Sequence, residues 1–222
     1  MRRALLGLAL LLACAVEAQM PAQPAEALGY RQTPAAWPLK QTPPALPAGQ
    51  TPPALPVTRT PPALPARGTV QVAFTPWDNA EAMIADGIRR AKHQILVQAY
   101  SFTSRTLAYA LIAAKRRGVD VQVMADREQT FSGESSRIPD LVQAGIPVVL
   151  DVRYQSAHNK VMVIDAGTVD AAVITGSYNW TYAAQNKNAE NVLILRDNPD
   201  VANAYAANWR RHFADALPYA AQ

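Results

Sequence analysis

The sequence predicts a layered α/β domain, a mixed β-sheet flanked by helices, behind an N-terminal segment that cannot fold in the same way. Half of the 222 residues are hydrophobic, which is enough to bury the core of one mid-sized domain. Segments with strand periodicity and segments with helix periodicity alternate from residue 69 onward. Thirteen of the 18 prolines, in contrast, lie between Pro21 and Pro65.

Strands and helices take turns between residues 69 and 150. The residues VQVAF alternate as a strand, and apolar residues then follow at helical spacing, with Asp78 placed to cap the first helix. The predicted strands are Val70–Phe74, Gln94–Phe102, Asp120–Met124 and Ile146–Leu150, and the predicted helices are Asn79–Lys92, Ser104–Gly118 and Ser136–Gln143.

The pattern becomes richer in strands after residue 150. Three further strands are predicted at Lys160–Ile164, Ala172–Thr175 and Asn191–Leu195. A final helix begins at Asn198-Pro199-Asp200, where asparagine caps and proline occupies the first helical position. Its predicted core side chains are Val201, Tyr205, Trp209 and Phe213.

The N-terminus is typical of an export signal. Met1-Arg2-Arg3 is followed by ALLGLALLLA, whose ten apolar residues are too few for a membrane-spanning helix of ~20 residues. We therefore expect residues 1–18 to be a signal peptide and the mature chain to be exported, periplasmic or secreted, with no membrane span. The run Leu11-Leu12-Ala13-Cys14 resembles a bacterial lipobox, so the alternative is a membrane-anchored lipoprotein acylated at Cys14.

Residues 19–68 are predicted to be a linker. The nine-residue unit QTPPALPAG at Gln41–Gly49 recurs at Gln50–Thr58 and Arg59–Arg67, with a diverged copy at Gln32–Lys40. Proline fixes φ and removes a backbone donor, so we expect polyproline II rather than helix or sheet. At ~3.1 Å per residue the repeats reach on the order of 110 Å. A plain spacer is favoured over a ligand for a proline-binding groove.

Charge and cysteine content exclude several classes of protein. Residues 1–68 hold six Lys/Arg against two Asp/Glu, whereas residues 69–222 hold fifteen of each, so the net charge of +4 belongs to the N-terminal segment. A strongly basic nucleic-acid scaffold is thereby excluded. One cysteine and three histidines exclude a disulfide framework and leave little material for a metal site. We expect no metal and no cofactor.

The candidate chemistry begins at His158 and Lys160. These residues lie two apart at the start of the strand predicted from AHNKVMVID, so their side chains project from one face. An ammonium can hold a phosphate as a point charge, and an imidazole can attack phosphorus or move protons near neutral pH. Asp165 has the opposite parity and fits a supporting or turn role.

A second group of polar residues follows Gly176, which would let the backbone approach a ligand closely. Ser177 and Asn179 again lie two apart, and their hydroxyl and amide can bind phosphate oxygens. Glu190 precedes the strand Asn191–Leu195, and a carboxylate that reaches a histidine nitrogen orients the imidazole. Each residue alone has an ordinary structural explanation, but the whole constellation is harder to explain in that way.

The run His158, Lys160, Asp165, then Gly176, Ser177 and Asn179, resembles the HKD signature of the phospholipase D superfamily. Residues 69–222 as a whole look like its small single-motif bacterial endonucleases, and the position of Glu190 agrees. The resemblance implies a phospholipase D-like catalytic domain at 69–222 and a metal-independent phosphodiesterase. It also implies His158, Lys160, Asp165 and Glu190 as catalytic residues and Lys160, Ser177 and Asn179 as substrate-binding residues.

Family members act through a phosphohistidine while a second histidine protonates the leaving oxygen, because one imidazole cannot be nucleophile and acid at once. This chain has one motif, and neither His93 nor His212 has an accompanying lysine. We therefore expect a twofold homodimer in which the partner's His158 is the general acid.

Nucleic acid, DNA or RNA, is the expected substrate because the resemblance is to nucleases. Two interpretations are open for the basic residues Arg89, Arg90, Lys92 and Lys115–Arg117, which could contact a phosphate backbone or simply end helices. They are equally open for Tyr154, Tyr178 and Trp180, which could stack on bases or pack in the wall of the site. A lipid phosphodiesterase or transphosphatidylase is the alternative function, and a non-catalytic phosphate-binding module is a third.

Overall fold

The computed structural model describes residues 60–132 and 135–220. The predicted signal peptide at 1–18, Cys14 and most of the linker at 19–68 lie outside these residues. Within them, residues 60–67 are exposed and form neither helix nor strand. Asn198 ties the end of this segment to the domain, because its side-chain amide donates to the carbonyl of Pro65 at 2.9 Å.

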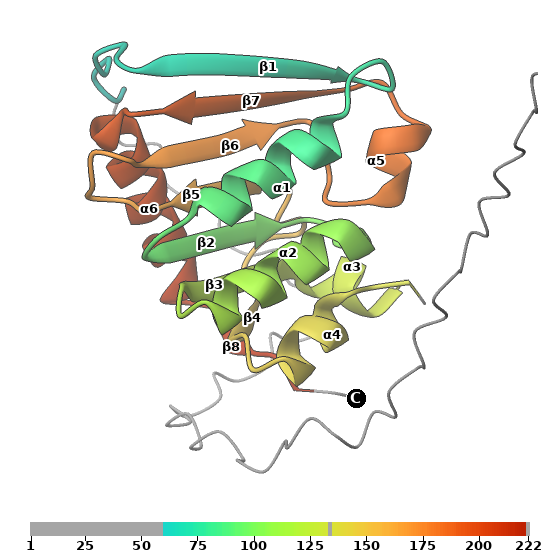
Figure 1. Ribbon diagram of the computed structural model, residues 1–222. Helices are drawn as coiled ribbons and strands as arrows, with labels where there is room; N and C mark the ends of the chain where they lie inside the picture. The colour runs from blue at the N-terminus through green and yellow to red at the C-terminus, as the bar shows by residue number, and fades with distance from the viewer. Residues whose placement is uncertain (1–59, 133–134, 221–222) are drawn as a thin grey trace, which may run out of the picture. The chain divides into compact units, whose positions relative to one another are not determined.

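The described residues form an eight-stranded mixed sheet in the order β1-β7-β6-β5-β2-β3-β4-β8 (Figure 1). The strands are β1 (Thr69–Thr75), β2 (Gln94–Ala99), β3 (Asp120–Asp126), β4 (Val148–Asp151), β5 (Lys160–Ile164), β6 (Ala172–Gly176), β7 (Glu190–Arg196) and β8 (Leu217–Pro218). The helices are α1 (Ala80–Arg90), α2 (Arg105–Arg116), α3 (Arg127–Ser132), α4 (Ile138–Gln143), α5 (Tyr182–Asn186) and α6 (Pro199–Phe213).

The pairing of the strands brings distant parts of the chain to one end of the sheet. β2, β3 and β4 are parallel, so their carboxyl ends meet at the same edge. β5 runs antiparallel to β2, and therefore begins at that edge. β6 ends there and β7 begins there, because each is antiparallel to its neighbour. Figure 1 shows α5 at this end of the sheet, where β1 also ends.

Helices cover both faces of the sheet, as the alternating pattern predicts. α1, α2 and α4 pack on one face in the larger apolar core, and α6 packs on the other (Figure 1). β5 is buried on both faces: Met162 and Ile164 belong to the larger core and Val161 and Val163 to the smaller one. This double burial explains its unbroken apolar run. Among the described residues, no helix has both the length and the apolar character that crossing a bilayer requires.

Most element boundaries agree with the sequence, and the differences have local causes. α1 is capped by Asn79 rather than Asp78, since the Asn79 side chain accepts the Ala82 N–H at 3.0 Å. The strand expected to run to Phe102 stops at Ala99. In α6, Trp209 is buried as predicted, while the three other side chains expected in its core are half-buried and pack against it.

Asp165 holds the far end of β5 to the loop that precedes β2. Its buried carboxylate accepts the backbone N–H groups of Lys92, His93 and Gln94 at 2.7–2.8 Å. Asp165 has a φ of 50°, a left-handed conformation in which aspartate and asparagine are enriched. The side chain therefore satisfies three backbone donors that the sheet leaves unpaired.

We predict that Asp165→Asn lowers the free energy of unfolding by about 2 kcal/mol, because the amide keeps one acceptor oxygen and leaves a backbone N–H facing a donor. Asp170→Asn is the matched control: Asp170 forms an exposed ion pair with Lys92, which solvent screens, so its loss should destabilise the fold much less than Asp165→Asn does. Urea denaturation measures both values. Equal losses in the two variants would contradict the role assigned to Asp165.

Candidate active site

His158 and Lys160 meet at the edge of the sheet where β5 begins. Lys160 is the first residue of β5, and its Nζ lies 2.8 Å from Nδ1 of His158. The same ammonium donates to the backbone carbonyl of His158 at 2.7 Å. His158 is exposed, whereas only 5% of Lys160 is accessible. The shared face predicted from their spacing is confirmed.

Tyr100 lies against both His158 and Lys160, although the sequence motif did not indicate it. It follows β2, and its backbone N–H donates to the carbonyl of Asn159 at 3.1 Å, which places the tyrosine beside the motif. The ring centroid of Tyr100 lies 4.3 Å from that of His158 and 4.6 Å from Nζ of Lys160. The aromatic face thus supports the imidazole and attracts the ammonium through a cation–π contact.

Burial lowers the pKa of Lys160 to about 8, because the apolar surroundings disfavour the charged amine. The negative charges of Glu190 and Asp126 act in the opposite direction and raise this pKa. At neutral pH the ammonium is therefore charged but only weakly hydrated. A desolvated cation of this kind binds an anion more strongly than an exposed lysine does.

The contact with Lys160 also determines where the proton of His158 resides. An ammonium has donors only, so Nδ1 of the imidazole must accept and the ring proton of the neutral form must sit on Nε2. In this state the Nε2–H of the neutral ring can donate a hydrogen bond to a phosphate oxygen, whereas general-acid catalysis requires the imidazolium, which carries a proton on both nitrogens. Attack on phosphorus requires the other tautomer, with Nδ1 facing an acceptor and Nε2 unprotonated.

Glu190, Ser177 and Asn179 lie at the same end of the sheet, but their bonds differ from the expectation. The Ser177 hydroxyl donates to the Glu190 carboxylate at 2.6 Å and accepts the Asn191 N–H at 3.0 Å. The second oxygen of Glu190 accepts from Asn188 at 2.9 Å. The expected contact between Glu190 and a histidine nitrogen is absent from the described part of the chain. The Asn179 amide oxygen is buried and unpaired in these residues.

Gly176 allows β6 and β7 to pair closely. Its φ is 149°, and a Cβ atom there would collide with the carbonyl oxygen of Asn191 on β7. The close backbone approach that the sequence predicts is therefore an approach between two strands, where only glycine fits.

A buried carboxylate holds the segment that leads to His158, and a second lies beside it in the sheet. Asp126, at the end of β3, accepts the backbone N–H of Ala157 at 2.8 Å. Asp151, at the end of β4 beside it in the sheet, bonds the ring of His212 at 2.7 Å. Each of these two aspartates is only 4% accessible. Asp126 thus positions the residue directly before His158, a role that no sequence pattern indicated.

Asp165 lies apart from this site. It follows the last residue of β5, whereas Lys160 is the first, so about 16 Å of extended chain separates them at roughly 3.3 Å per residue. With its carboxylate bound to three backbone N–H groups, Asp165 has the supporting role that its parity predicts rather than the catalytic one that the motif implied.

The aromatic residues considered for base stacking are mostly core residues. Tyr178 and Trp180 are each 1% accessible, and the Trp180 indole donates to the carbonyl of Gln98 at 3.0 Å. Burial raises the pKa of Tyr178, which keeps its phenol neutral. Tyr154 packs against His212, with ring centroids 4.9 Å apart. Packing is thus the role of Tyr178 and Trp180.

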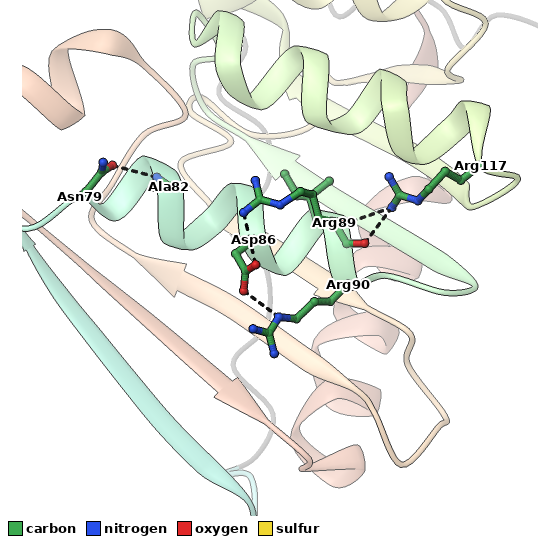
Figure 2. A network of polar contacts seen from close by, with 7 residues as sticks. Asn79, Ala82, Asp86, Arg89, Arg90 and Arg117 are labelled. Atoms are coloured by element: carbon green, nitrogen blue, oxygen red, sulfur yellow. Dashed lines mark hydrogen bonds and ion pairs between the residues drawn. The ribbon is translucent and has the colours of Figure 1, made fainter.

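Four of the six basic residues at the helix ends have structural partners. Figure 2 shows Asp86 paired with Arg89 and Arg90, and the Arg117 guanidinium bound to the last carbonyls of α1. Lys92 pairs with Asp170. Arg89, Arg90 and Lys92 precede β2, and Arg117 precedes the parallel strand β3, so all four lie at the end of the sheet opposite the candidate site. Their geometry favours helix termination over contact with a substrate.

Comparison with known proteins identifies the family. Residues 84–214 match the family model described as cardiolipin synthase, PLD-like domain. A protein of Rickettsia felis named phospholipase D is 40% identical over 143 residues, which cover 64% of this chain and 68% of that protein. The mitochondrial cardiolipin hydrolase of Xenopus laevis is 33% identical over 141 residues, 64% of each chain.

Among solved structures, the phospholipase D family member Nuc from Salmonella typhimurium superposes with a TM-score of 0.65. The two chains are 32% identical, and the match covers 70% of this chain and all of Nuc. The chain belongs to the phospholipase D superfamily, and it is accordingly a phosphodiesterase.

We predict that hydrolysis of a simple phosphodiester, bis(4-nitrophenyl) phosphate, falls as pH rises through about 8, because Lys160 then loses its proton. Asp126→Asn should move this fall to lower pH, since it removes a negative charge that raises the pKa of Lys160. Asp120→Asn, at the exposed start of the same strand, should leave it in place. An Asp126→Asn profile that is lower in rate but unshifted in pH would contradict the electrostatic role.

Proposed function

We propose that the protein is a metal-independent endonuclease that hydrolyses DNA or RNA through a phosphohistidine on His158. The observation that carries the proposal is the exposed imidazole of His158 beside the buried ammonium of Lys160. Nε2 of the imidazole is open to a substrate, and the ammonium is placed to hold a phosphate oxygen next to it. Ser177 and Asn179 add a hydroxyl and an amide at the same edge of the sheet.

The proposed reaction has two displacements. In the first, Nε2 of one His158 attacks phosphorus, a nitrogen–phosphorus bond forms and the bond to the leaving oxygen breaks. The partner's His158 protonates that oxygen. In the second, water attacks the phosphohistidine while the partner's His158 takes its proton, and the nitrogen–phosphorus bond breaks. Protons and electron pairs balance without an external oxidant or reductant.

A second copy of the chain is needed because the described residues offer no other suitable imidazole. His93 lies at the far end of β5, where its backbone bonds Asp165. His212 has a side chain only 14% accessible and bonded to buried Asp151. A twofold homodimer would bring in the second imidazole.

Nucleic acid is the proposed substrate because the folded region resembles small single-motif endonucleases and matches the whole length of Nuc. A lipid phosphodiesterase is the second candidate, which is favoured by the names of the relatives from Rickettsia felis and Xenopus laevis. Among the described residues, no group of three or more His, Cys, Asp or Glu side chains is arranged to hold a metal ion. Export through residues 1–18, with or without acylation of Cys14, remains a prediction.

We predict that the full chain cleaves nucleic acid in the presence of EDTA and that His158→Ala lowers the rate about a thousandfold or more, because the attacking nitrogen is removed. The melting temperature should stay the same, since His158 is exposed and precedes the strand. His93→Ala is the matched control and should retain full activity. Plasmid DNA, RNA and phosphatidylcholine vesicles are offered in parallel.

Retained turnover in His158→Ala, or an EDTA-induced loss that magnesium reverses, would refute the proposed mechanism. Hydrolysis of phosphatidylcholine with both nucleic acids left intact would replace the nuclease by the lipid phosphodiesterase.

A further inference from the structure

A pocket of about 760 Å³ lies at the same end of the sheet as the candidate active site. Its walls come from the connection between β1 and α1, from the start of α2 and from α5. Two of its lining residues are large aromatics that the fold leaves uncovered: 82% of Trp77 and 62% of Tyr182 are accessible. Both rings line the same pocket, so their uncovered faces are available to a ligand bound there.

Hydrogen bonds connect the pocket directly to the site. The backbone N–H groups of Thr103 and Ser104, in one wall, donate to the carbonyl of Trp180, the residue after Asn179. Thr75, which leads into the opposite wall, accepts the Glu190 N–H at 3.1 Å. The pocket and the candidate catalytic residues therefore lie at one end of the sheet, where a bound polymer could contact both.

The walls of the pocket are also fixed to one another. Gln185 of α5 donates to the carbonyl of Asp78 at 3.0 Å and accepts the Glu81 N–H at 2.9 Å. Glu81 in turn accepts the Ser104 hydroxyl at 2.5 Å. Three segments far apart in the sequence are thus bonded into one frame, so the pocket is formed before a ligand arrives.

The lining suits a nucleobase next to a phosphate. An unpaired base has a flat face that stacks on tryptophan or tyrosine, whereas a base inside a duplex already has both faces covered. Arg105 lines the same pocket, is exposed and forms no ion pair within the described residues, so its guanidinium is available to a backbone phosphate. The remaining lining is largely polar, with Asp78, Asn79 and Ser104 among it, which disfavours an acyl chain.

We propose that this pocket binds an unpaired base of a single-stranded nucleic acid by stacking on Trp77 and Tyr182, and that the enzyme therefore prefers single strands. The inference rests on the proposed nuclease function and names its substrate class. It assigns a binding role to two aromatic residues outside the catalytic motif.

The test measures binding separately from cleavage. Fluorescence anisotropy gives the Kd of a labelled oligothymidylate and of a duplex of equal length for the full chain carrying His158→Ala. In that background, Trp77→Ala and Tyr182→Ala should each raise the single-strand Kd about tenfold, the typical loss of one stacking contact. Trp77→Phe and Tyr182→Phe keep a ring and should restore most of the affinity. Tyr109→Ala, which removes a 68% exposed tyrosine outside the pocket, should change nothing.

Hydrolysis of bis(4-nitrophenyl) phosphate, measured with His158 intact, serves as the control for folding and chemistry and should be the same in all pocket variants. Unchanged single-strand affinity in both alanine variants, or equal losses of affinity for single strand and duplex, would overturn the inference. The proposed nuclease function would still stand if the native chain cleaves nucleic acid.

A chain that hydrolyses the small phosphodiester but neither binds nor cleaves nucleic acid would overturn the proposed function as well. Loss of binding to phosphatidylglycerol vesicles in Trp77→Ala, with the oligothymidylate Kd unchanged, would assign the pocket to a membrane surface and overturn the inference.

Discussion

The site depends on one buried charge. The Lys160 ammonium is held between the His158 imidazole and the Tyr100 ring, at the point where β5 enters the sheet. The same desolvation that lowers its pKa makes it an effective partner for an anion, because less water competes with the phosphate. Carboxylates nearby keep it protonated at neutral pH. Burial and countercharge are thus balanced so that a weakly hydrated cation is available where the chemistry takes place.

Carboxylates bound to backbone N–H groups place this charge accurately. Asp165 fixes the far end of β5 to the loop before β2, and Asp126 fixes Ala157 immediately before His158. The strand that carries Lys160 is therefore anchored at its far end by Asp165, and the segment before His158 is held by Asp126. Asp165 is part of the family motif, yet its contribution is to the geometry of the strand rather than to the reacting atoms.

Local rules predicted the long elements, and distant contacts explain what they missed. The apolar run of β5 and the Asn198 cap of α6 can be recognised from residues that are neighbours in the sequence. The same holds for the shared face of His158 and Lys160. α5 has five residues, and β8 is a two-residue strand that exists through its pairing with β4, so neither has a periodic signal of its own. Tyr100 and Asp126 reach the site through the order of the strands. Within one chain the Glu190 carboxylate bonds Ser177 and Asn188 rather than a histidine.

One chain supplies one imidazole at the candidate site, while the proposed reaction needs two, one as nucleophile and one as proton donor. The most direct test mixes increasing amounts of inactive His158→Ala chain with a fixed amount of native chain. The two are allowed to exchange subunits before cleavage is measured. If two imidazoles from two copies act on one phosphate, a dimer of one native and one variant chain is inactive. Cleavage then falls steadily as more variant is added. Activity that stays constant however much variant is present would show that each chain works alone, and the shared site would be wrong.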